Sequence, residues 1–224
     1  MVSIVHLSDA FVVVNKPAGC DFHDDQGTPG LFTQVRQHLR EEELYPVHRL
    51  DKVTSGLVVM ARTADANREL CEQFRQAQVQ KYYLAISAKK PVKKQGAIAG
   101  DMQPARRGAW RLARSMDNPA RTVFVSSSLA PGLRLFLLKP FTGKTHQLRV
   151  ALKSIGAPIL GDTLYAGEPA DRVYLHAWRL GFQLAGQGYV FTQTPDFGEH
   201  FMRPELPQAL AAWSPPEQLS WPRV

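Results

Sequence analysis

Apolar residues cluster along the chain in short runs that predict strands. An uninterrupted run at 11–15 has the pattern of a buried strand, and it ends at the turn-forming sequence Lys16-Pro17-Ala18-Gly19. Six further segments rich in β-forming residues predict strands, the last two as a closing hairpin: 55–61, 81–87, 122–126, 133–139, 174–182 and 188–194. The chain therefore contains more predicted strands than helices.

Helices are predicted where apolar residues recur with helical spacing, at 31–43, 64–78, 145–155 and 204–213. Leu31, Val35 and Leu39 form such a stripe in the first, and Thr63 is the expected N-terminal cap of the second. This pattern favours an α+β fold with a mixed or mainly antiparallel sheet flanked by helices and loops.

No linker rich in Pro or Gly divides the chain. We therefore expect a single domain at 1–213 and an irregular C-terminal tail at 214–224. A length of 224 residues is compatible with this organisation.

Composition excludes several classes of protein. Apolar residues make up 44% and charged residues 21%, which is ordinary globular usage and rules out wholesale disorder. The apolar runs are far shorter than the ~20 residues of a membrane span, and the N-terminus lacks the features of a secretory signal. Cys20 and Cys71 form neither a CxxC pair nor a disulfide framework. We expect a cytoplasmic protein with reduced thiols and no membrane partner.

Positive charge is concentrated between residues 89 and 121. Of the chain's 27 Lys and Arg residues, nine lie here: Lys89, Lys90, Lys93, Lys94, Arg106, Arg107, Arg111, Arg114 and Arg121. Asp101 and Asp117 alone oppose them. Such a segment is typical of a surface that binds a polyanion, because contacts with phosphates release counterions. The alternative is a solvated basic loop; frequent Pro and Gly residues argue against a membrane-binding helix.

Candidate catalytic chemistry begins at Asp51, in a predicted loop that leads into the strand at 55–61. Loops held by a rigid scaffold often carry catalytic groups. Arg49 and Lys52 flank Asp51 and favour its ionised form. An ion-pair partner is the alternative role. No second carboxylate is paired with Asp51 in the sequence, so the pattern does not indicate a conventional glycosidase.

Two other segments have candidate binding residues. Free N–H groups at the start of the predicted helix 145–155, with Lys144 beside them, favour an anion, although the spacing of a Walker phosphate loop is absent. From that helix Arg149 has the chemistry to hold a carboxylate such as Asp51 by a bidentate pair. A surface arginine, and a structural role for His146, remain the alternatives.

The sequence Lys81-Tyr82-Tyr83 lies in a predicted strand, where successive side chains point to opposite faces. One tyrosine is expected in the core. The other is available to line a cleft and to stack on an unpaired base. Two packed tyrosines are the alternative.

Taken together, these segments resemble the RluA-type pseudouridine synthases. The motifs occur in the family's order over roughly residues 12–182, and the ordered set is highly specific: Val13-Val14-Asn15-Lys16-Pro17-Ala18-Gly19, His48-Arg49-Leu50-Asp51, Thr54-Ser55-Gly56-Leu57, Lys81-Tyr82-Tyr83, Gly143-Lys144-Thr145-His146-Gln147-Leu148-Arg149, Gly156-Ala157-Pro158-Ile159-Leu160-Gly161-Asp162 with Tyr165, and Leu175-His176-Ala177. The resemblance implies a catalytic domain with a central cleft. Since the pattern begins near residue 11, we expect the short form without an N-terminal S4 domain.

The resemblance also implies an activity. The family converts uridine to pseudouridine in structured RNA, either ribosomal or transfer RNA: the N1–C1′ bond breaks, the uracil turns, and C5 bonds to C1′. By motif position Asp51 is the essential carboxylate, Tyr83 the aromatic that stacks on the target base, and Arg149 the basic partner of Asp51. Whether Asp51 attacks C1′ or removes a ribose proton stays open. The base must leave its stack to be reached.

RNA contacts are expected from a wider set of residues. Arg49 is placed near the flipped nucleotide, and the other candidates for base or phosphate contacts are Lys81, Lys144, His146, Lys93, Lys94, Arg106 and Arg107. The reaction is redox-neutral, so neither a cofactor nor a metal is expected, and we expect a monomer. The alternatives are a catalytically inactive RNA-binding relative and a hydrolytic nucleosidase.

Overall fold

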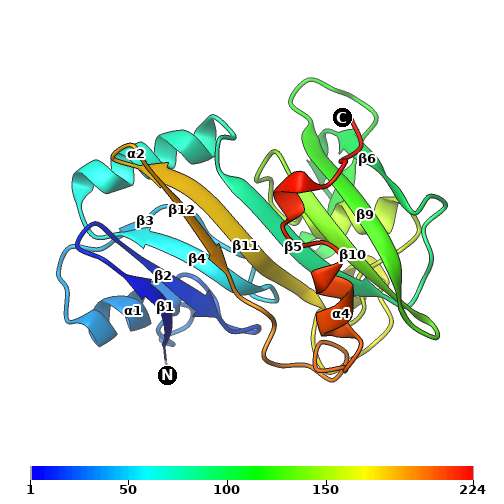
Figure 1. Ribbon diagram of the computed structural model, residues 1–224, viewed down its shortest axis with the longest axis horizontal. Coiled ribbons are helices and arrows are strands. Elements are labelled where there is room, and N and C mark those ends of the chain that lie inside the picture. Colours follow the sequence, from blue (N-terminus) through cyan, green and yellow to red (C-terminus); the bar gives the residue numbers. More distant parts are fainter. Residues whose placement is uncertain (1, 224) are drawn as a thin grey trace. The chain divides into compact units, whose positions relative to one another are not determined.

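The computed structural model describes residues 2–223, which form two compact units (Figure 1). Unit 1 contains the chain up to Lys81 together with His176–Thr194. Unit 2 contains Tyr82–Leu175 and the chain from Pro195 onward. Runs of strands along the chain are interrupted by a few helices, and the α+β fold class with a mixed, mainly antiparallel sheet is confirmed. The single domain at 1–213 and the tail at 214–224 stay predictions.

Unit 1 is built on strands in the spatial order β1-β2-β4-β11-β12, with the short β3 beside β4. Neighbouring strands are antiparallel except for β4 and β11, which are parallel. The strands are β1 (Ser3–Leu7), β2 (Phe11–Lys16), β3 (Tyr45–Pro46), β4 (Ser55–Ala61), β11 (Leu175–Leu184) and β12 (Gln187–Thr192). The predicted closing hairpin is therefore β11–β12.

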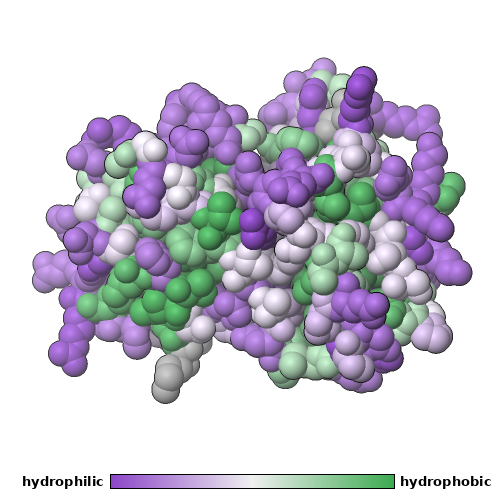
Figure 2. Space-filling model, viewed as in Figure 1, coloured by the Kyte–Doolittle hydropathy of each residue, from purple (hydrophilic) through white to green (hydrophobic). Residues whose placement is uncertain are grey.

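The core of unit 1 explains why its central strands could be predicted. Every residue of β2 and β4 is buried, as expected for apolar runs covered on both faces. Helix α2 (Ala64–Arg75) packs Ala66 and Leu70 inward, and the Thr63 hydroxyl caps it by accepting a 3.2 Å hydrogen bond from the N–H of Ala66. Its outer face is hydrophilic (Figure 2).

Helix α1 (Leu31–Leu39) is shorter than its predicted range. It ends because Arg40 adopts the left-handed conformation, with φ of 57°, and its N–H bonds the carbonyl of Gln37. Beyond it the side chains of Glu42 and Glu43 are exposed, so no apolar contact continues the helix. At the edge strand β1 apolar side chains remain partly exposed, and Figure 2 shows an apolar area over β1 and β2.

Unit 2 is built on antiparallel strands in the order β5-β10-β9-β6. The strands of this unit, including the separate hairpin β7–β8, are β5 (Gln80–Ser87), β6 (Gln95–Gly100), β7 (Met102–Pro104), β8 (Trp110–Leu112), β9 (Ala120–Ala130) and β10 (Leu133–Pro140). Its helical segments are α3 (Gln147–Ser154), α4 (Leu206–Ala211) and the 3-10 turns η1 (Arg106–Gly108), η2 (Thr163–Tyr165) and η3 (Pro216–Gln218).

The basic segment 89–121 contains structure that the hydrophobic pattern did not indicate. Strand β6 pairs with β9, and the three-residue strands β7 and β8 form a hairpin around η1. These strands are short and half-exposed, so their sequence lacks a buried apolar run. In the described part of the chain, no helix has both the length and the hydropathy needed to cross a membrane.

Candidate active site

Asp51 lies in a loop of unit 1 whose backbone is fixed on both sides. The Thr54 N–H donates to the carbonyl oxygen of Asp51 at 3.0 Å, and Thr54 is itself buried. The Lys52 carbonyl accepts from the N–H of Gly19 at 2.8 Å and from the Nζ of Lys16 at 3.0 Å. The half-buried Asp51 side chain is thus presented by a loop that is held at its own and the following residue.

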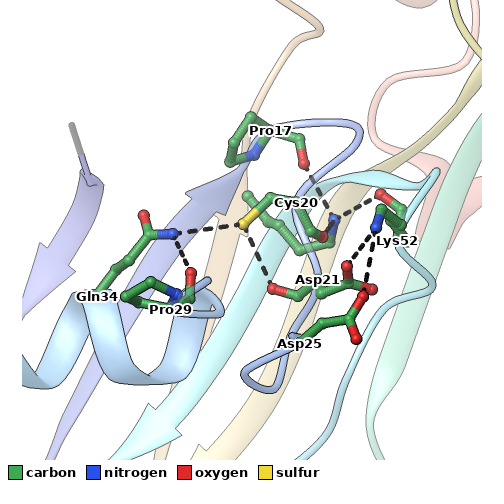
Figure 3. A network of polar contacts seen from close by, with 8 residues as sticks. Pro17, Cys20, Asp21, Asp25, Pro29, Gln34 and Lys52 are labelled. Atoms are coloured by element: carbon green, nitrogen blue, oxygen red, sulfur yellow. Dashed lines mark hydrogen bonds and ion pairs between the residues drawn. The ribbon is translucent and has the colours of Figure 1, made fainter. Parts of the chain in front are cut away.

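Lys16, the last residue of β2, links the loop that follows β2 to the loop that contains Asp51. It is 0% exposed, and its ammonium donates to the carbonyls of Pro17, Cys20 and Lys52 at 3.0, 2.6 and 3.0 Å. Figure 3 shows Pro17, Cys20 and Lys52, the residues that supply these carbonyls, close together. A lysine ammonium has three donors, so each finds an acceptor. The sequence analysis quoted Lys16 within a motif but gave it no role. The signal that could have revealed this role is a charged residue at the end of an apolar strand.

Lys52 was expected to favour the ionised form of Asp51. Its ammonium forms an ion pair with Asp21 at 2.6 Å and lies 4.0 Å from Asp25 (Figure 3), and its effect on Asp51 stays a prediction. The hydrogen bond with Asp21 raises the pKa of Lys52. Because this pair is largely exposed, it adds little to stability. These contacts link the 21–25 loop to the loop that contains Asp51 and Lys52.

The strand that follows the Asp51 loop is joined closely to β11. A Cβ on Gly56 would lie 2.3 Å from the backbone oxygen of Ala177, and Gly56 has φ of +110°, so only glycine permits this parallel pairing. Beside it, the buried His176 bonds Ser55 Oγ through Nδ1 and the Gln193 carbonyl through Nε2, both at 2.7 Å. A carbonyl only accepts, so Nε2 carries a proton.

His48, three residues before Asp51, attaches the start of this loop to neighbouring elements of unit 1. Its Nε2 accepts the Val59 N–H at 3.1 Å, and its ring stacks on Phe74 with centroids 4.4 Å apart. Burial, and then the charge of Lys81, lower the pKa of His48 to about 3. His48 is therefore neutral at pH 7 and anchors the loop to β4 and α2.

Lys81 is the last residue of the first of the two segments that form unit 1, and it is 8% exposed. Its Nζ is 5.7 Å from the centroid of the Phe74 ring, and burial lowers its pKa to about 8. Arg49, by contrast, is exposed. Contacts of Arg49 and Lys81 with RNA stay predictions.

In unit 2, the two adjacent tyrosines of β5 have different surroundings. Tyr82 is 0% exposed and packs in the core, with its ring centroid 5.9 Å from that of Trp221. Tyr83 is half-buried. The expected division between one core tyrosine and one accessible tyrosine is therefore observed, with Tyr83 as the accessible one.

Arg149 is held by a partner that the sequence analysis did not assign. Its Nε and Nη2 donate to the two carboxylate oxygens of Asp162 at 2.7 and 2.8 Å, a bidentate pair in which the residues are 5% and 1% exposed. The guanidinium also lies over the Tyr165 ring, 4.9 Å from its centroid. Both partners occur in the quoted motif around Gly161. The pairing of Arg149 with Asp51 stays a prediction.

The loop before α3 is fixed by Gln147 and Tyr165. Gln147 Oε1 accepts the Thr142 hydroxyl at 2.7 Å and the Lys144 N–H at 3.0 Å. The Tyr165 hydroxyl accepts the Trp110 N–H at 2.9 Å and bonds His146 Nδ1 at 2.7 Å. Because His146 has a left-handed φ of 56°, the helix begins at Gln147 and not at 145.

The remaining predicted RNA contacts lie in unit 2. Four of them are exposed: Lys93, Lys94, Arg106 and Arg107. Lys144 is half-buried, and its Nζ donates to the Asn118 side chain at 2.9 Å. The predicted catalytic residues thus come from both units, Asp51 from unit 1 and Tyr83 and Arg149 from unit 2. Among residues 2–223, no group of three or more His, Cys, Asp or Glu is arranged to hold a metal ion.

Comparison with known proteins gives a consistent set of similarities. A family model described as RNA pseudouridylate synthase matches residues 10–154. The chain is 47% identical to an uncharacterized RNA pseudouridine synthase of Haemophilus influenzae, over 92% of each chain. It is 35% identical to the dual-specificity RNA pseudouridine synthase RluA of Escherichia coli K12, over 78% of this chain and 83% of that protein.

Solved structures agree. Human RNA Pseudouridylate Synthase Domain Containing 1 superposes with a TM-score of 0.74 at 28% identity, covering 88% of this chain and 84% of that chain. Human RNA Pseudouridylate Synthase Domain Containing 4 gives a TM-score of 0.73 at 27% identity, covering 92% and 93%.

Proposed function

Since this chain belongs to the RluA-type RNA pseudouridylate synthases, enzymes that isomerise uridine in RNA to pseudouridine, we propose that it modifies a specific uridine of ribosomal or transfer RNA. In this proposal Asp51 is the essential carboxylate, and the target base is flipped out of its stack. Family membership supplies the reaction. The substrate and the residue roles are the proposal.

One observation carries the role of Asp51. Hydrogen bonds of 2.8 and 3.0 Å from Gly19 and Lys16 fix the carbonyl of Lys52, and a bond of 3.0 Å from Thr54 fixes the carbonyl of Asp51. The side chain of Asp51 is half-buried. A pre-positioned anion is what the reaction requires, because positive charge develops at C1′ as the base departs.

The chemistry assigns complementary roles to Arg149 and Tyr83. Asp162 engages Nε and Nη2 of Arg149, and we assign Arg149 the role of basic partner of the Asp51 carboxylate. Tyr83 stacks on the extruded uracil.

The atoms balance without a co-reactant. The N1–C1′ bond breaks, the uracil turns, and a C5–C1′ bond forms. The hydrogen on C5 leaves as a proton, a step in which we assign Tyr83 as the assisting group, and N1 gains a proton. Asp51 either attacks C1′ or removes a ribose proton during the first step.

RNA binding is assigned to the exposed basic residues. Lys93, Lys94, Arg106 and Arg107 present charge to phosphates, and Arg49 lies two residues before Asp51, beside the flipped nucleotide. Phosphate contacts of this kind give affinity without base readout, so the target uridine must be selected by the shape of the RNA and by contacts near the site.

Mapping pseudouridines tests this proposal. Ribosomal and transfer RNA from cells with and without the gene are compared, and purified protein is then added to the RNA that lacks the modification. We expect one or a few sites to be lost in the deletion and restored by the protein, with no free uracil released. Release of uracil would indicate a nucleosidase. RNA binding without any gain of pseudouridine would indicate an inactive relative.

A further inference from the structure

Unit 2 contains a cavity of about 410 Å³ that the sequence analysis did not identify. It is lined by the hairpin β7–β8, by the turn that follows β8 and by the loop before α3: Asp101, Met102, Trp110, Asp117, Asn118, Gly143, Lys144 and Thr145. Its volume lies in the range of roughly 300–1,000 Å³ that is typical of sites for small molecules. A single nucleotide is a ligand of this size class.

The hairpin gives the cavity an apolar wall. Successive side chains of a strand alternate between faces, so Met102 and Trp110 lie on one face, and Gln103 and Arg111, joined by a 2.9 Å hydrogen bond, lie on the other. Trp110 is only partly buried. A partly exposed indole that lines a cavity is a stacking surface for a nucleobase.

The polar wall is built around Asp101. Its carboxylate accepts the N–H groups of Asp117 at 3.0 Å and Asn118 at 2.8 Å. Bonds from Ser115 and from these N–H groups, with the nearby Lys144, lower the pKa of Asp101. Asp101 thus has a structural role, because its carboxylate fixes the turn. The exposed carboxylate of Asp117 is the group in this wall that can accept hydrogen bonds from the N–H groups of a base.

Positive charge occurs in the wall of this cavity and on the segments that form it. Lys144 lines it, and its Nζ reaches the Asn118 side chain at 2.9 Å. The hairpin and the segment after it also contain four exposed arginines: Arg106, Arg107, Arg111 and Arg114. A stacking surface bordered by cations matches a nucleotide of a polyanionic strand.

The cavity is also connected to Arg149. The backbone N–H of Trp110 donates to the Tyr165 hydroxyl at 2.9 Å, and the Tyr165 ring lies under the Arg149 guanidinium at 4.9 Å. One side chain therefore joins the cavity wall to the arginine that we place beside the target uridine.

From these contacts we infer that the cavity binds an unpaired nucleotide of the substrate RNA that flanks the target uridine, with its base stacked on Trp110. This inference rests on the proposed function, because the flanking position is defined by the target. It gives the enzyme a second contact by which one uridine is selected among many.

Affinity and cross-linking test the inference separately from the reaction. The probe is total RNA from cells that lack the gene. Trp110→Ala is expected to raise the Kd and the KM for this RNA at least five-fold while kcat stays within about twofold, since stacking is worth that much per base. Trp110→Phe keeps an aromatic surface and should restore most of the affinity, which separates stacking from misfolding. The matched control is Phe197→Ala, an aromatic that is 60% exposed elsewhere in unit 2.

Ultraviolet cross-linking of the wild type to the same RNA, followed by mass spectrometry, should identify a nucleotide adduct on Trp110. Affinity of Trp110→Ala within twofold of the wild type, or adducts confined to other peptides, would overturn the inference even if pseudouridine is formed. If the wild type forms no pseudouridine, the proposed function fails, while the adduct and the affinities still decide whether the cavity binds RNA.

Discussion

The Nζ of Lys16 donates a 3.0 Å hydrogen bond to the backbone oxygen of Lys52, the residue that follows Asp51. Two loops that are distant in the sequence are thereby joined at a buried charge. The ammonium is compensated by three backbone carbonyl oxygens, those of Pro17, Cys20 and Lys52. This contact gives the Asp51 loop a defined position before RNA binds.

Replacement of Lys16 by Met should destabilise the protein and slow the reaction. Three hydrogen bonds from a charged donor are lost, each worth roughly 1.5–3 kcal/mol, and the carbonyls they leave are only partly exposed to water. We expect the free energy of unfolding in urea to fall by at least about 3 kcal/mol, and kcat to fall more than KM rises. Lys52→Met is the matched control, with an expected loss of under about 1 kcal/mol, since that side chain is 54% exposed. Equal effects of the two substitutions would contradict the tether.

Gly56→Ala should be severely destabilising. The new Cβ would meet the backbone of Ala177 at 2.3 Å, which forces β4 and β11 apart. We expect a loss above about 3 kcal/mol in urea unfolding. Gly132→Ala is the control, because that glycine also has a positive φ, +75°, but open space around it; it should cost about 1 kcal/mol. A similar loss at both positions would show that backbone conformation, and not close approach, decides the cost.

Stability should decrease in mild acid because of His48. Its pKa is about 3 in the folded protein, against about 6.5 in the unfolded chain. Between these values the unfolded chain binds more protons, so the free energy of unfolding falls as the pH falls below 6.5. This group alone should cost about 1–2 kcal/mol between pH 7 and pH 5.

The comparison is between urea unfolding curves at the two pH values. His48→Gln, which keeps an acceptor for the Val59 N–H, should show a smaller loss than the wild type. His38→Gln, at an exposed position in α1, should behave as the wild type does. An unchanged pH dependence in His48→Gln would mean that the ring is already protonated or well solvated in the folded protein.

Asp162→Asn should cost about 3–5 kcal/mol, because it removes the charge of the buried carboxylate that engages the buried guanidinium of Arg149. Activity should fall as well, since the orientation of Arg149 depends on the bidentate pair. Unfolding in urea measures the first effect and the rate of pseudouridine formation the second. Glu168→Gln, at an exposed position of the same loop, should change neither. A loss of under 1 kcal/mol in Asp162→Asn would show that Arg149 is held mainly by other contacts.

Much of the fold could be read from the sequence where burial is continuous. The runs that form β2 and β4 are covered on both faces, so their apolar residues reveal them. The hairpin β7–β8 could not be predicted, because its short strands are half-exposed and depend on bonds to Asp101 and Tyr165 that are made across the fold.

The site shows the same limit. Motif position was sufficient to select Asp51, Tyr83 and Arg149 as candidates. Lys16 fixes the loop of Asp51 and Asp162 holds Arg149; both are buried charges, and the hydrophobic pattern did not identify the contacts that they make. The predicted monomeric state and cytoplasmic location stay predictions.

Asp51→Asn is the most direct test of the central claim. The substitution keeps the size and the hydrogen-bonding loop and removes the charge. Single-turnover pseudouridine formation in RNA that lacks the modification should become undetectable, while the affinity for that RNA stays within a few fold of the wild type. Asp65→Asn, an exposed carboxylate on α2, should leave both unchanged. Pseudouridine formation by Asp51→Asn at a rate near that of the wild type would contradict the account.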